Sequence, residues 1–370
     1  MDINISTIFF SMERIILLAD LDYFYAQAEQ VRKPELKDKP VAVCMFSGRT
    51  EFSGAVATSN YRARELGVKA GMPIGLAKSK SPDIILLPAD RDYYTTVSDR
   101  IMEILRLHAD KFEQVSIDEA YLDVSQRMKG DFGAAQKLAE EIKAKIFEEE
   151  KLTCSIGIGP NKLIAKMAAG VKKPDGLMVV VPTEVAKFLA TQGISDLHGV
   201  GPKTIGVLSQ NGIMTIKDLA SAPPLQLQEW FGQNKGLALH QKALGLDEGE
   251  VEEKASAQFS RIATLKENTS SAQKLIEESA KLAQDLHEKA VKEKVFFRTV
   301  SVILISNHLE DVTRSKTLPS PTQDINKILE TSADLFRAFF SEKPGFVCRR
   351  FGLRISGFEE PKAQKGIFEY

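Results

Sequence analysis

Residues 14–20 read RIILLAD and residues 115–124 read VSIDEAYLDV, and these two stretches indicate both the fold and the chemistry. The first is an apolar run, typical of a buried strand, that ends on Asp20. The second alternates like a half-buried strand or hairpin and is interrupted by Asp118 and Glu119. A carboxylate removed from water is costly unless it is paired or binds a metal ion. Three such groups on strands of one sheet could therefore collect two divalent cations.

Such a pair of cations would suit chemistry at phosphorus. Hard cations such as Mg²⁺ prefer carboxylate oxygens, often together with substrate phosphates. Two of them roughly 4 Å apart are the usual arrangement for in-line displacement at phosphorus. A structural explanation stays open for each stretch. Asp20 could cap a helix predicted to start at Tyr23, and Asp118 with Glu119 could form a solvated hairpin turn.

The bulk properties are those of a globular protein. The chain has 370 residues, of which 43% are hydrophobic and 27% are charged, and this length exceeds the usual single domain. No apolar stretch approaches the length of a membrane span, so we expect no membrane partner. Cys44, Cys154 and Cys348 are far apart, which predicts reduced core cysteines and a cytoplasmic protein. Residues 1–11 lack the features of a signal peptide, and we interpret them as an extension that precedes a natural start at Met12.

The charge is unevenly distributed although the net charge is only −1. Residues 254–370 carry 19 Lys and Arg against 15 Asp and Glu, and residues 247–253 carry five acids and no base. The remaining residues, 1–246, balance at 30 against 30. The sequence therefore predicts a neutral N-terminal unit joined by an acidic connector to a basic C-terminal unit. Basic residues gathered on one face could attract a phosphate backbone.

The segment after the acidic connector predicts a ferredoxin-like split βαβ unit. Its periodicities give the order βαββαβ between residues 258 and 355. Helices would cover one face of such a sheet, and a basic open face could lie along a nucleic-acid duplex. The basic residues on the predicted strands are Arg261, Arg298, Arg314, Lys316, Arg349, Arg350 and Arg354.

A second candidate DNA contact precedes the connector. Residues 197–204 read LHGVGPKT, which places two glycines in a tight loop that opens a helix. This pattern is typical of a helix-hairpin-helix, whose backbone N–H groups bind a DNA phosphate without regard to sequence. An ordinary turn between two helices is the alternative. The DNA-binding residues of this loop would be Gly199, Val200, Gly201 and Lys203.

Several motifs occur together in one order along the chain. Residues 20–29 read DLDYFYAQAE, residues 53–64 read SGAVATSNYRAR, residues 67–73 read GVKAGMP, and residues 116–123 read SIDEAYLD. This set closely resembles the Y-family translesion DNA polymerases, and among them the archaeal lesion-bypass branch of the DNA polymerase IV type. The resemblance extends from about residue 12 to about residue 358.

The resemblance implies an α+β multidomain chain with the right-hand polymerase architecture. A palm would comprise residues 12–31 and 91–180, and small fingers residues 32–90. A helix-hairpin-helix thumb would span residues 181–246, an acidic linker 247–256, and a C-terminal βαββαβ little finger 257–358. Residues 359–370 would form a tail. Part of it, QKGIFEY at residues 364–370, partly resembles a sliding-clamp-binding peptide, with a frayed terminus as the alternative.

The resemblance also implies the reaction. A DNA-directed DNA polymerase of low fidelity would bypass lesions by transferring a nucleotide from a dNTP to the primer 3′-hydroxyl, releasing pyrophosphate. Its partners would be primer-template DNA and dNTPs, and it would act as a monomer. Two Mg²⁺ ions per active site, replaceable by Mn²⁺, would bind Asp20, Asp118, Glu119 and the Leu21 carbonyl. Asp22 would have an orienting role. No 3′–5′ exonuclease segment is evident, so errors would remain.

The remaining site residues implied by the resemblance concern the nucleotide. Tyr25 would be a steric gate, because an aromatic ring beneath the sugar leaves no room for a 2′-hydroxyl. Ala55 and Ala57 would cover the nascent base pair and leave space above a damaged template base. Tyr61 and Arg64 are three residues apart on a predicted helix and would share a face. The full set of nucleotide-binding residues would be Tyr23, Phe24, Tyr25, Thr58, Tyr61, Arg64 and Lys173.

Two other functions compete with polymerisation. Nucleotide cyclases place carboxylates on a similar palm-like sheet, but they need neither a helix-hairpin-helix nor a second basic domain. A non-catalytic DNA-binding scaffold could retain the fold, but it would not need a complete set of carboxylate, gate and triphosphate residues. Metal-dependent primer extension would separate all three.

Overall fold

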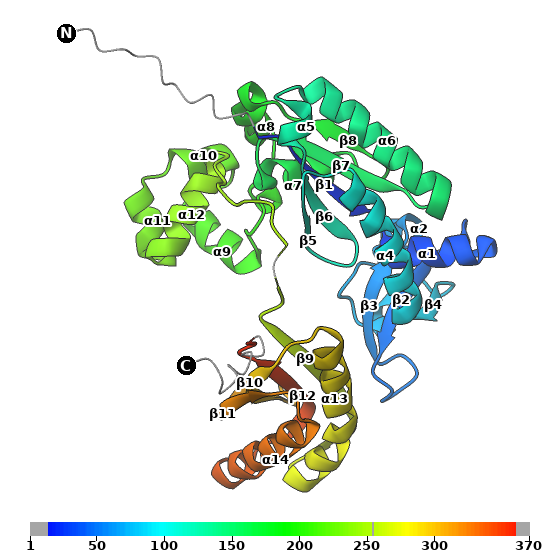
Figure 1. Cartoon of the computed structure of the whole chain (residues 1–370), viewed down its shortest axis with the longest axis vertical. Helices are drawn as coiled ribbons and strands as arrows, with labels where there is room; N and C mark the ends of the chain where they lie inside the picture. Colours follow the sequence, from blue (N-terminus) through cyan, green and yellow to red (C-terminus); the bar gives the residue numbers. More distant parts are fainter. Residues whose placement is uncertain (1–13, 254, 360–370) are drawn as a thin grey trace, which may run out of the picture. The chain divides into compact units, whose positions relative to one another are not determined.

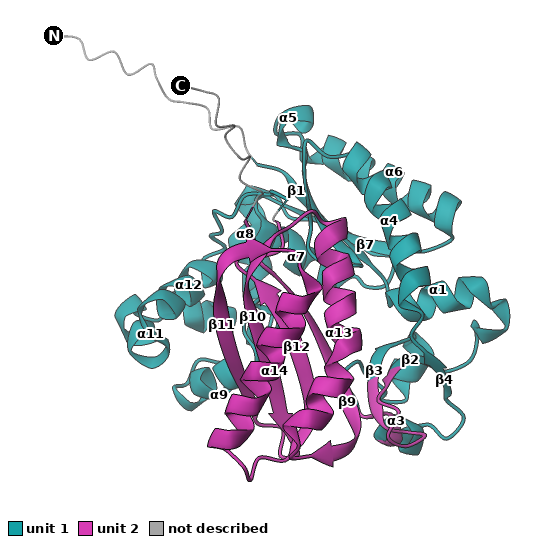
Figure 2. Cartoon of the chain, turned by 60° about the horizontal axis from the view of Figure 1, so that its bottom comes forward, with its two compact units in different colours: residues 1–44, 56–72, 76–254 teal, residues 45–55, 73–75, 255–370 magenta. Residues whose placement is uncertain are grey.

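The computed structural model describes residues 14–253 and 255–359, which divide into two compact units (Figure 2). The first unit consists of residues 1–44, 56–72 and 76–254, and the second of residues 45–55, 73–75 and 255–370. Residues 1–11, interpreted as an extension, lie outside the described residues. So does the peptide at residues 364–370 that resembles a clamp-binding motif.

A five-stranded sheet is the centre of the first unit (Figure 1). Its strand order is β5-β6-β1-β7-β8, with β1 antiparallel to both of its neighbours. The strands are β1 (Ile16–Leu21), β5 (Lys111–Gln114), β6 (Glu119–Asp123), β7 (Cys154–Gly159) and β8 (Leu177–Val179). The predicted strand around residues 14–20 is confirmed as β1.

Both faces of this sheet are covered, which explains why the run at residues 14–20 is apolar without alternation. Leu17 and Ala19 join a core with helices α4 (Arg91–Leu107) and α6 (Phe132–Glu150). Ile16 and Leu18 point to the opposite face, where they meet α7 (Lys162–Val171). Asp131 caps α6 by accepting a hydrogen bond from the Ala134 N–H.

A smaller sheet of order β3-β2-β4 lies within the predicted fingers. The Asn60 side chain caps helix α2 by accepting from the Ala63 N–H, which begins that helix directly after β3. The elements of residues 24–90 are α1 (Phe24–Arg32), η1 (Pro34–Leu36), β2 (Val41–Phe46), β3 (Gly54–Ser59), α2 (Tyr61–Glu65), α3 (Ile74–Lys80) and β4 (Ile85–Pro88).

Short helices follow β8, as the predicted helix-hairpin-helix requires. Gly199 has a φ of +93°, in the left-handed region that favours glycine, and Gly201 is the N-cap of α9. The elements are η2 (Pro182–Glu184), α8 (Val185–Ala190), η3 (Ile194–Asp196), α9 (Pro202–Gln210), α10 (Ile216–Ser221), α11 (Pro224–Phe231) and α12 (Gln233–Ala243). A further short helix, α5 (Ser125–Met128), follows β6.

The acidic segment 247–253, predicted to be a connector, packs within the first unit. Val251 is fully buried beside Ile16 and Leu18. Around it, Lys111 pairs with Glu250 at 3.1 Å and Arg106 with Glu253 at 2.8 Å. Arg14 donates to the Gly249 carbonyl at 2.6 Å. The segment is held because basic side chains of β5 and α4 pair with two of its five acids, Glu250 and Glu253.

The second unit has the predicted βαββαβ order. Its sheet has the order β11-β10-β12-β9, and helices α13 and α14 lie side by side across one face (Figure 2). Val300, Val302, Leu353 and Ile355 lie on that face, in the core. The elements are β9 (Gln258–Thr269), α13 (Ala272–Lys292), β10 (Phe297–Ser306), β11 (Asp311–Thr322), α14 (Ile325–Glu342) and β12 (Cys348–Ser356).

Two further findings bear on the sequence analysis. Within residues 14–253 and 255–359, no helix is both long enough and apolar enough to cross a membrane. The three cysteines, Cys44, Cys154 and Cys348, are buried free thiols, as predicted.

The packing of Val251 gives a test of the acidic segment's attachment. We expect Val251→Asp to lower the free energy of unfolding of the first unit by about 2 kcal/mol or more, because it buries a carboxylate without a partner. Urea denaturation followed by circular dichroism measures this change. Val31→Ala, at a valine that is 38% exposed, is the control and should change stability by less than about 0.5 kcal/mol. Equal stability of both variants would show that the segment is detached in solution.

Candidate active site

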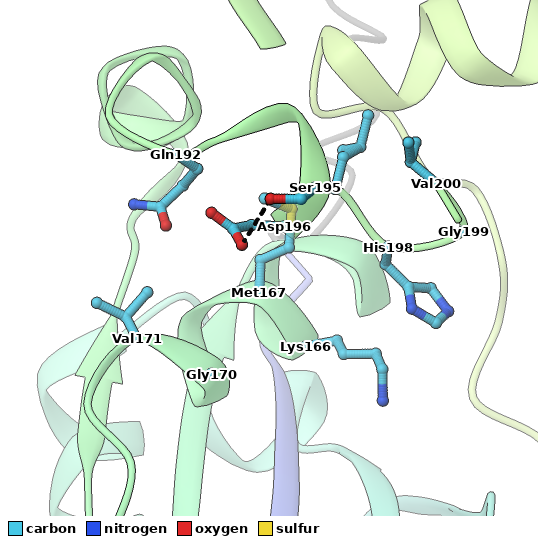
Figure 3. Close-up of a pocket in the computed structure, with 11 residues that line it drawn as sticks. Lys166, Met167, Gly170, Val171, Gln192, Ser195, Asp196, His198, Gly199 and Val200 are labelled. Atoms are coloured by element: carbon cyan, nitrogen blue, oxygen red, sulfur yellow. Dashed lines mark hydrogen bonds between the residues drawn. The ribbon is translucent and has the colours of Figure 1, made fainter. Parts of the chain in front are cut away.

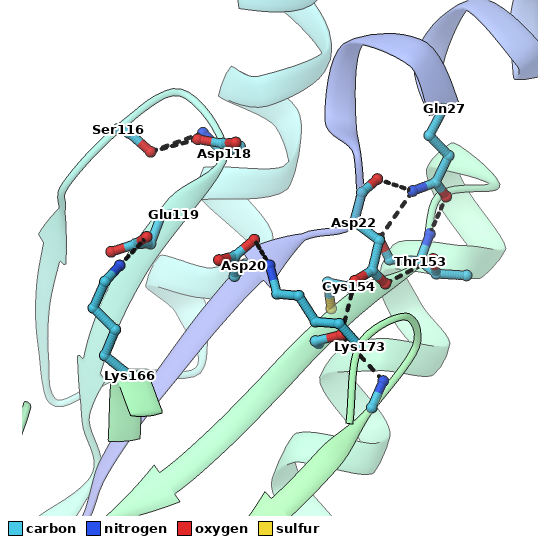
Figure 4. Close-up of polar contacts among 12 residues, drawn as sticks. Asp20, Asp22, Gln27, Ser116, Asp118, Glu119, Thr153, Cys154, Lys166 and Lys173 are labelled. Atoms are coloured by element: carbon cyan, nitrogen blue, oxygen red, sulfur yellow. Dashed lines mark hydrogen bonds and ion pairs between the residues drawn. The ribbon is translucent and has the colours of Figure 1, made fainter. Parts of the chain in front are cut away.

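Antiparallel pairing of β1 with β6 brings the predicted carboxylates together (Figure 4). Asp20 is the register partner of Glu119, and the Leu21 N–H donates to the Asp118 carbonyl at 2.8 Å. The four predicted metal-ligating residues therefore lie at one end of two adjacent strands, although they come from distant parts of the sequence.

The alternatives left open by the sequence are decided here. Asp20 does not cap α1, because the N-cap position is Tyr23, and no side chain of the described residues supplies a cap hydrogen bond there. Asp118 does lie in the turn between β5 and β6. The Ser116 hydroxyl donates to Asp118 Oδ1 at 2.5 Å and accepts from its N–H at 3.3 Å. This turn places Asp118 at the same strand end as Asp20. Asp118 is therefore both a turn residue and a candidate metal ligand.

Two lysines neutralise the carboxylates in this arrangement. The Lys173 ammonium pairs with Asp20, and Lys166 donates to Glu119 Oε2 at 2.5 Å. Burial raises the pKa of Asp20 above its ordinary value, and the Lys173 charge partly opposes this. The negative charges of Asp118 and Glu119 raise the Asp20 pKa further, which shows that the three acids interact.

The donor set fits a hard divalent cation, although the acids do not yet converge on one point. Among the residues that the structure describes, no three His, Cys, Asp or Glu side chains form a group that could hold a metal. The two lysines neutralise the negative charges of Asp20 and Glu119 instead. Glu119 Oε1 is buried without a hydrogen-bond partner in the described chain, so one ligand atom is available. The ligand atoms of Asp20, Asp118 and Glu119 are all carboxylate oxygens, which are the ligands that Mg²⁺ prefers.

Lys166 was missed by the sequence analysis. It lies one helical turn after Lys162 on α7, and Lys162 pairs with Glu113 of β5 at 2.6 Å. The two lysines thus meet two acids of neighbouring strands, Glu113 and Glu119. The signal was present in the sequence as two lysines four residues apart on a helix whose other residues are largely apolar.

Three predicted nucleotide-binding residues form one cluster. The rings of Tyr23 and Tyr61 meet edge to face, with centroids 5.2 Å apart, and Arg64 Cζ lies 4.8 Å from the Tyr61 ring centroid. The Arg64 Nε–H donates to the Ser59 carbonyl at 3.0 Å, which fixes the guanidinium. Thr58 is half-buried on β3, directly ahead of this cluster in the sequence.

Phe24 offers its backbone rather than its side chain to a nucleotide. The side chain is only 2% exposed and packs in the core of the first unit. Only its backbone N–H, in the first turn of α1, is suited to such a contact, because the first N–H groups of a helix have no intrahelical partner.

Tyr25 has a fixed ring. It stacks on Tyr94 with centroids 4.4 Å apart and an interplanar angle of 15°. Tyr94 is fully buried, and its hydroxyl donates to Glu29 Oε1 at 3.0 Å. Ala55 and Ala57 are two residues apart on β3, so they point to one face of that strand.

A cavity of about 520 Å³ lies between α7 and the predicted helix-hairpin-helix loop (Figure 3). Lys166, His198, Gly199 and Val200 are among its lining residues. Partial burial and the charges of Lys166 and Lys242 lower the His198 pKa. Lys242 also donates to the His198 carbonyl at 3.1 Å, which ties the loop to α12. Lys203 is exposed on α9.

The expected basic face of the C-terminal sheet is only partly formed. Arg354 is paired with Ser301 and Arg350 with Ile305, on the face opposite the helices. Arg350 Nε and Arg354 Nε are buried and lack a hydrogen-bond partner among the described residues. These two side chains lie where the prediction placed them. Arg298 and Arg349 lie at irregularities of the strand pairing.

The other three basic side chains are on the helix-covered face. The register pairs Arg314 with Val302, Lys316 with Val300 and Arg261 with Leu353, and each of these partners is in the core. They belong to the edge strands, where a long side chain reaches past the core to a helix. Accordingly Arg314 lies 3.5 Å from Glu342, Lys316 3.5 Å from Asp334 and Arg261 3.9 Å from Asp285. The expectation of an open-face position is wrong for these three residues.

Comparison with known proteins places these features in one family. The sequence model of the impB/mucB/samB family matches residues 19–170, and that of its C-terminal domain matches residues 256–367. A model described as the thumb domain of DNA polymerase-iota matches residues 195–247. The chain is 44% identical to DNA polymerase IV 1 of Methanosarcina mazei, over 97% of this chain and 100% of that protein. It is 38% identical to DNA polymerase IV of Saccharolobus solfataricus, over 92% and 95%.

Solved structures agree with the sequence comparison. The Y-family DNA polymerase chimera Dbh-Dpo4(243-245)-Dbh has a TM-score of 0.89 and 37% identity, over 94% of this chain and 99% of that chain. The insertion ternary complex of Dbh DNA polymerase has a TM-score of 0.70 and 37% identity, over 92% and 98%. The chain therefore belongs to the Y-family DNA polymerases, together with the archaeal DNA polymerase IV proteins.

Proposed function

We propose that the protein is a template-directed DNA polymerase of low fidelity that bypasses DNA lesions. The observation that carries the proposal is the β1–β6 register, which sets Asp20 beside Glu119 and ties Leu21 to Asp118. Two further features of the first unit support the proposal. The cluster of Tyr23, Tyr61 and Arg64 suits a triphosphate, and the fixed ring of Tyr25 suits a steric gate. Relatives that are 44% and 38% identical to this chain are named DNA polymerase IV.

The carboxylates of Asp20, Asp118 and Glu119 and the Leu21 carbonyl would hold two Mg²⁺ ions, for which Mn²⁺ can substitute. When bound, such ions activate the primer 3′-hydroxyl and neutralise charge on the leaving pyrophosphate. Before such ions bind, Lys166 and Lys173 neutralise the negative charges of Glu119 and Asp20 and hold these side chains in place. Asp22 takes no part as a ligand, because its carboxylate is buried among donors of the neighbouring strand.

The triphosphate is bound by groups that surround this strand end. Arg64 can engage phosphate oxygens bidentately, and the Tyr61 hydroxyl donates one hydrogen bond. Lys173 offers its ammonium, and Thr58 a hydroxyl. The N–H groups of Phe24 and Tyr25 begin α1, where the helix dipole favours an anion. Tyr23 contributes through its backbone.

Sugar and base are selected differently. Tyr25, backed by the buried Tyr94, forms a rigid floor that a 2′-hydroxyl cannot pass. Ala55 and Ala57 place only methyl groups over the nascent pair, which leaves room for damaged template bases and lowers fidelity. With no proofreading step, the errors would persist.

DNA would be held at two places. The loop of Gly199, Val200, Gly201 and Lys203 offers backbone N–H groups to a phosphate of the duplex. In the C-terminal unit, Arg350 and Arg354 are the best-placed cations, since they lie on the open face four residues apart, about 13 Å along the strand. Arg298 and Arg349 add charge at its rim.

We assign the parts of the chain accordingly. The palm comprises residues 12–31 and 91–180, the fingers 32–90, the thumb 181–246 and the little finger 257–358. Residues 247–256 connect thumb and little finger, with their first part docked on the palm through Val251. We further propose a cytoplasmic monomer whose residues 359–370 contact a sliding clamp.

The direct test is primer extension with Mg²⁺ and all four dNTPs. We expect Asp118→Asn, which keeps the turn's hydrogen bonds but loses the charge, to lower the rate at least about 100-fold. Glu248→Gln, at an exposed acid, is the matched control and should extend normally. DNA binding without any extension by the wild type would identify a scaffold. Conversion of a nucleoside triphosphate to a cyclic nucleotide without DNA would identify a cyclase.

The gate is tested by offering ribonucleotides. We expect Tyr25→Ala to raise the relative efficiency of ribonucleotide insertion by about 10- to 200-fold, which is the range that one excluded group commands in a pocket. Tyr25→Phe keeps the ring and should behave as the wild type. Steady-state kcat/KM ratios for matched dNTP and rNTP pairs measure the effect. Unchanged sugar discrimination in Tyr25→Ala would remove the assignment of the gate.

The sheet register gives a matched test of the little finger. We expect Arg350→Ala/Arg354→Ala to weaken binding to primer-template DNA and to reduce the slope of log K against log salt by about 2, or roughly 0.9 for each phosphate contact. Arg314→Ala/Lys316→Ala removes the same charge from the helix-covered face and should leave the slope near that of the wild type. Fluorescence anisotropy titrations at several salt concentrations measure both. Equal slopes for the two double variants would contradict the proposed interface.

A further inference from the structure

The turn that carries Lys173 is unusually well fixed for a surface connection. Residues 172–176 join α7 to β8, and Asp175 has a φ of +54°. A side chain at Gly176 would bring Cβ within 2.4 Å of the Lys172 carbonyl oxygen, so the backbone is tightly folded back. The Lys173 side chain starts from this turn and its ammonium pairs with Asp20, so the backbone of the turn sets the range over which the ammonium can be placed.

Asp22 holds the turn from the inside (Figure 4). Its side chain is 1% exposed, and it accepts hydrogen bonds from the Thr153 and Ser155 hydroxyls at 2.9 and 2.8 Å. The third donor to its carboxylate is the Asp175 N–H at 2.8 Å. The Ser155 hydroxyl oxygen also accepts from the Gly176 N–H at 3.1 Å. Two consecutive backbone N–H groups of the turn are therefore directed to Asp22 and its partner.

Lys143 of α6 holds the same turn from the opposite side. Its ammonium donates to Asp175 Oδ1 at 2.6 Å, to the Gly176 carbonyl at 3.3 Å and to the Cys154 carbonyl at 2.5 Å. The ammonium thus bridges the turn to β7, the strand that also carries Ser155. All three of its donors are used within this one junction.

This junction is linked to the metal-type site through β1. Asp20 and Asp22 are two residues apart at the end of that strand, and Lys173 reaches back to pair with Asp20. Asp20 therefore contacts the ammonium while Asp22 fixes the backbone that carries it. A shift of the turn by 1 Å would move the ammonium away from both Asp20 and a neighbouring triphosphate.

We infer that Asp22 and Lys143 are positioning residues that preorganise the Lys173 turn to receive the triphosphate of the incoming nucleotide. The inference rests on the proposed polymerase function and adds to it two residues that touch neither substrate nor metal. Preorganisation matters here because a small displacement of a binding group can cost a large factor in rate or affinity. A purely structural role would instead affect folding and every kinetic constant alike.

The experiment is a double-mutant cycle between Lys143 and Lys173 in primer extension. We expect Lys143→Met to raise the KM for dNTP about 10-fold, with kcat, primer-template affinity and the Mg²⁺ requirement close to those of the wild type. In the background of Lys173→Met, adding Lys143→Met should raise KM no further, because Lys143 acts through Lys173. The same factor in both backgrounds, or no change in Lys143→Met alone, would overturn the inference.

A second pair of variants covers the inner side of the turn. Thr153→Val removes one donor to Asp22, whereas Thr153→Ser retains it. We expect only Thr153→Val to raise the KM for dNTP, and thermal melts followed by circular dichroism to show both variants folded. Equal KM values for the two would argue against Asp22. Wild-type protein that binds DNA but does not extend a primer would refute the proposed function itself, whereas wild-type KM values for dNTP in both Lys143→Met and Thr153→Val would refute only the positioning roles.

Discussion

The antiparallel register between β1 and β6 is the constraint on which the rest of the active site depends. It sets Asp20 opposite Glu119 and joins Leu21 to the turn residue Asp118. A slip of one residue would send every side chain of β1 to the other face of the sheet. Such a slip is opposed because both faces of β1 are covered, with Leu17 and Ala19 packed on one side and Ile16 and Leu18 on the other. Core packing thus fixes the geometry of the carboxylates.

Charge compensation follows from that geometry. Acids gathered at one strand end repel each other, and the raised pKa of Asp20 shows this together with its burial. Lysines from α7 and the following turn meet these acids, so the site is stable before substrate arrives. The same kind of pairing attaches the acidic segment 247–253 to β5 and α4 of the first unit, through Lys111 and Arg106. In a chain with a net charge of −1, these acids are thus matched locally by basic side chains.

The C-terminal sheet shows how strand position decides what an arginine does. On the central strand β12, Arg350 and Arg354 face away from the helices, on the face that we propose to contact a duplex. On the edge strands β9 and β11, Arg261 and Arg314 extend past the core and pair with acids of the helices. Their contribution is to seal the margins of the core, where their stems cover apolar surface. The register of its strand thus decides whether an arginine lies on the open face of the sheet or pairs with an acid of a helix.

The sequence by itself determined the buried strand at residues 14–20, the βαββαβ order, the glycine loop before α9 and, through its motifs, the family and the carboxylate set. Hydrophobic periodicity and turn-forming residues are local properties, so they can be recognised in the sequence without knowledge of the fold. Only the tertiary structure decided that Val251 docks, that Lys166 meets Glu119, that Phe24 is buried and Tyr25 stacked, and that three basic residues face helices. Each of these depends on which distant segment lies opposite a side chain. The spacing of residues along the chain does not specify that segment.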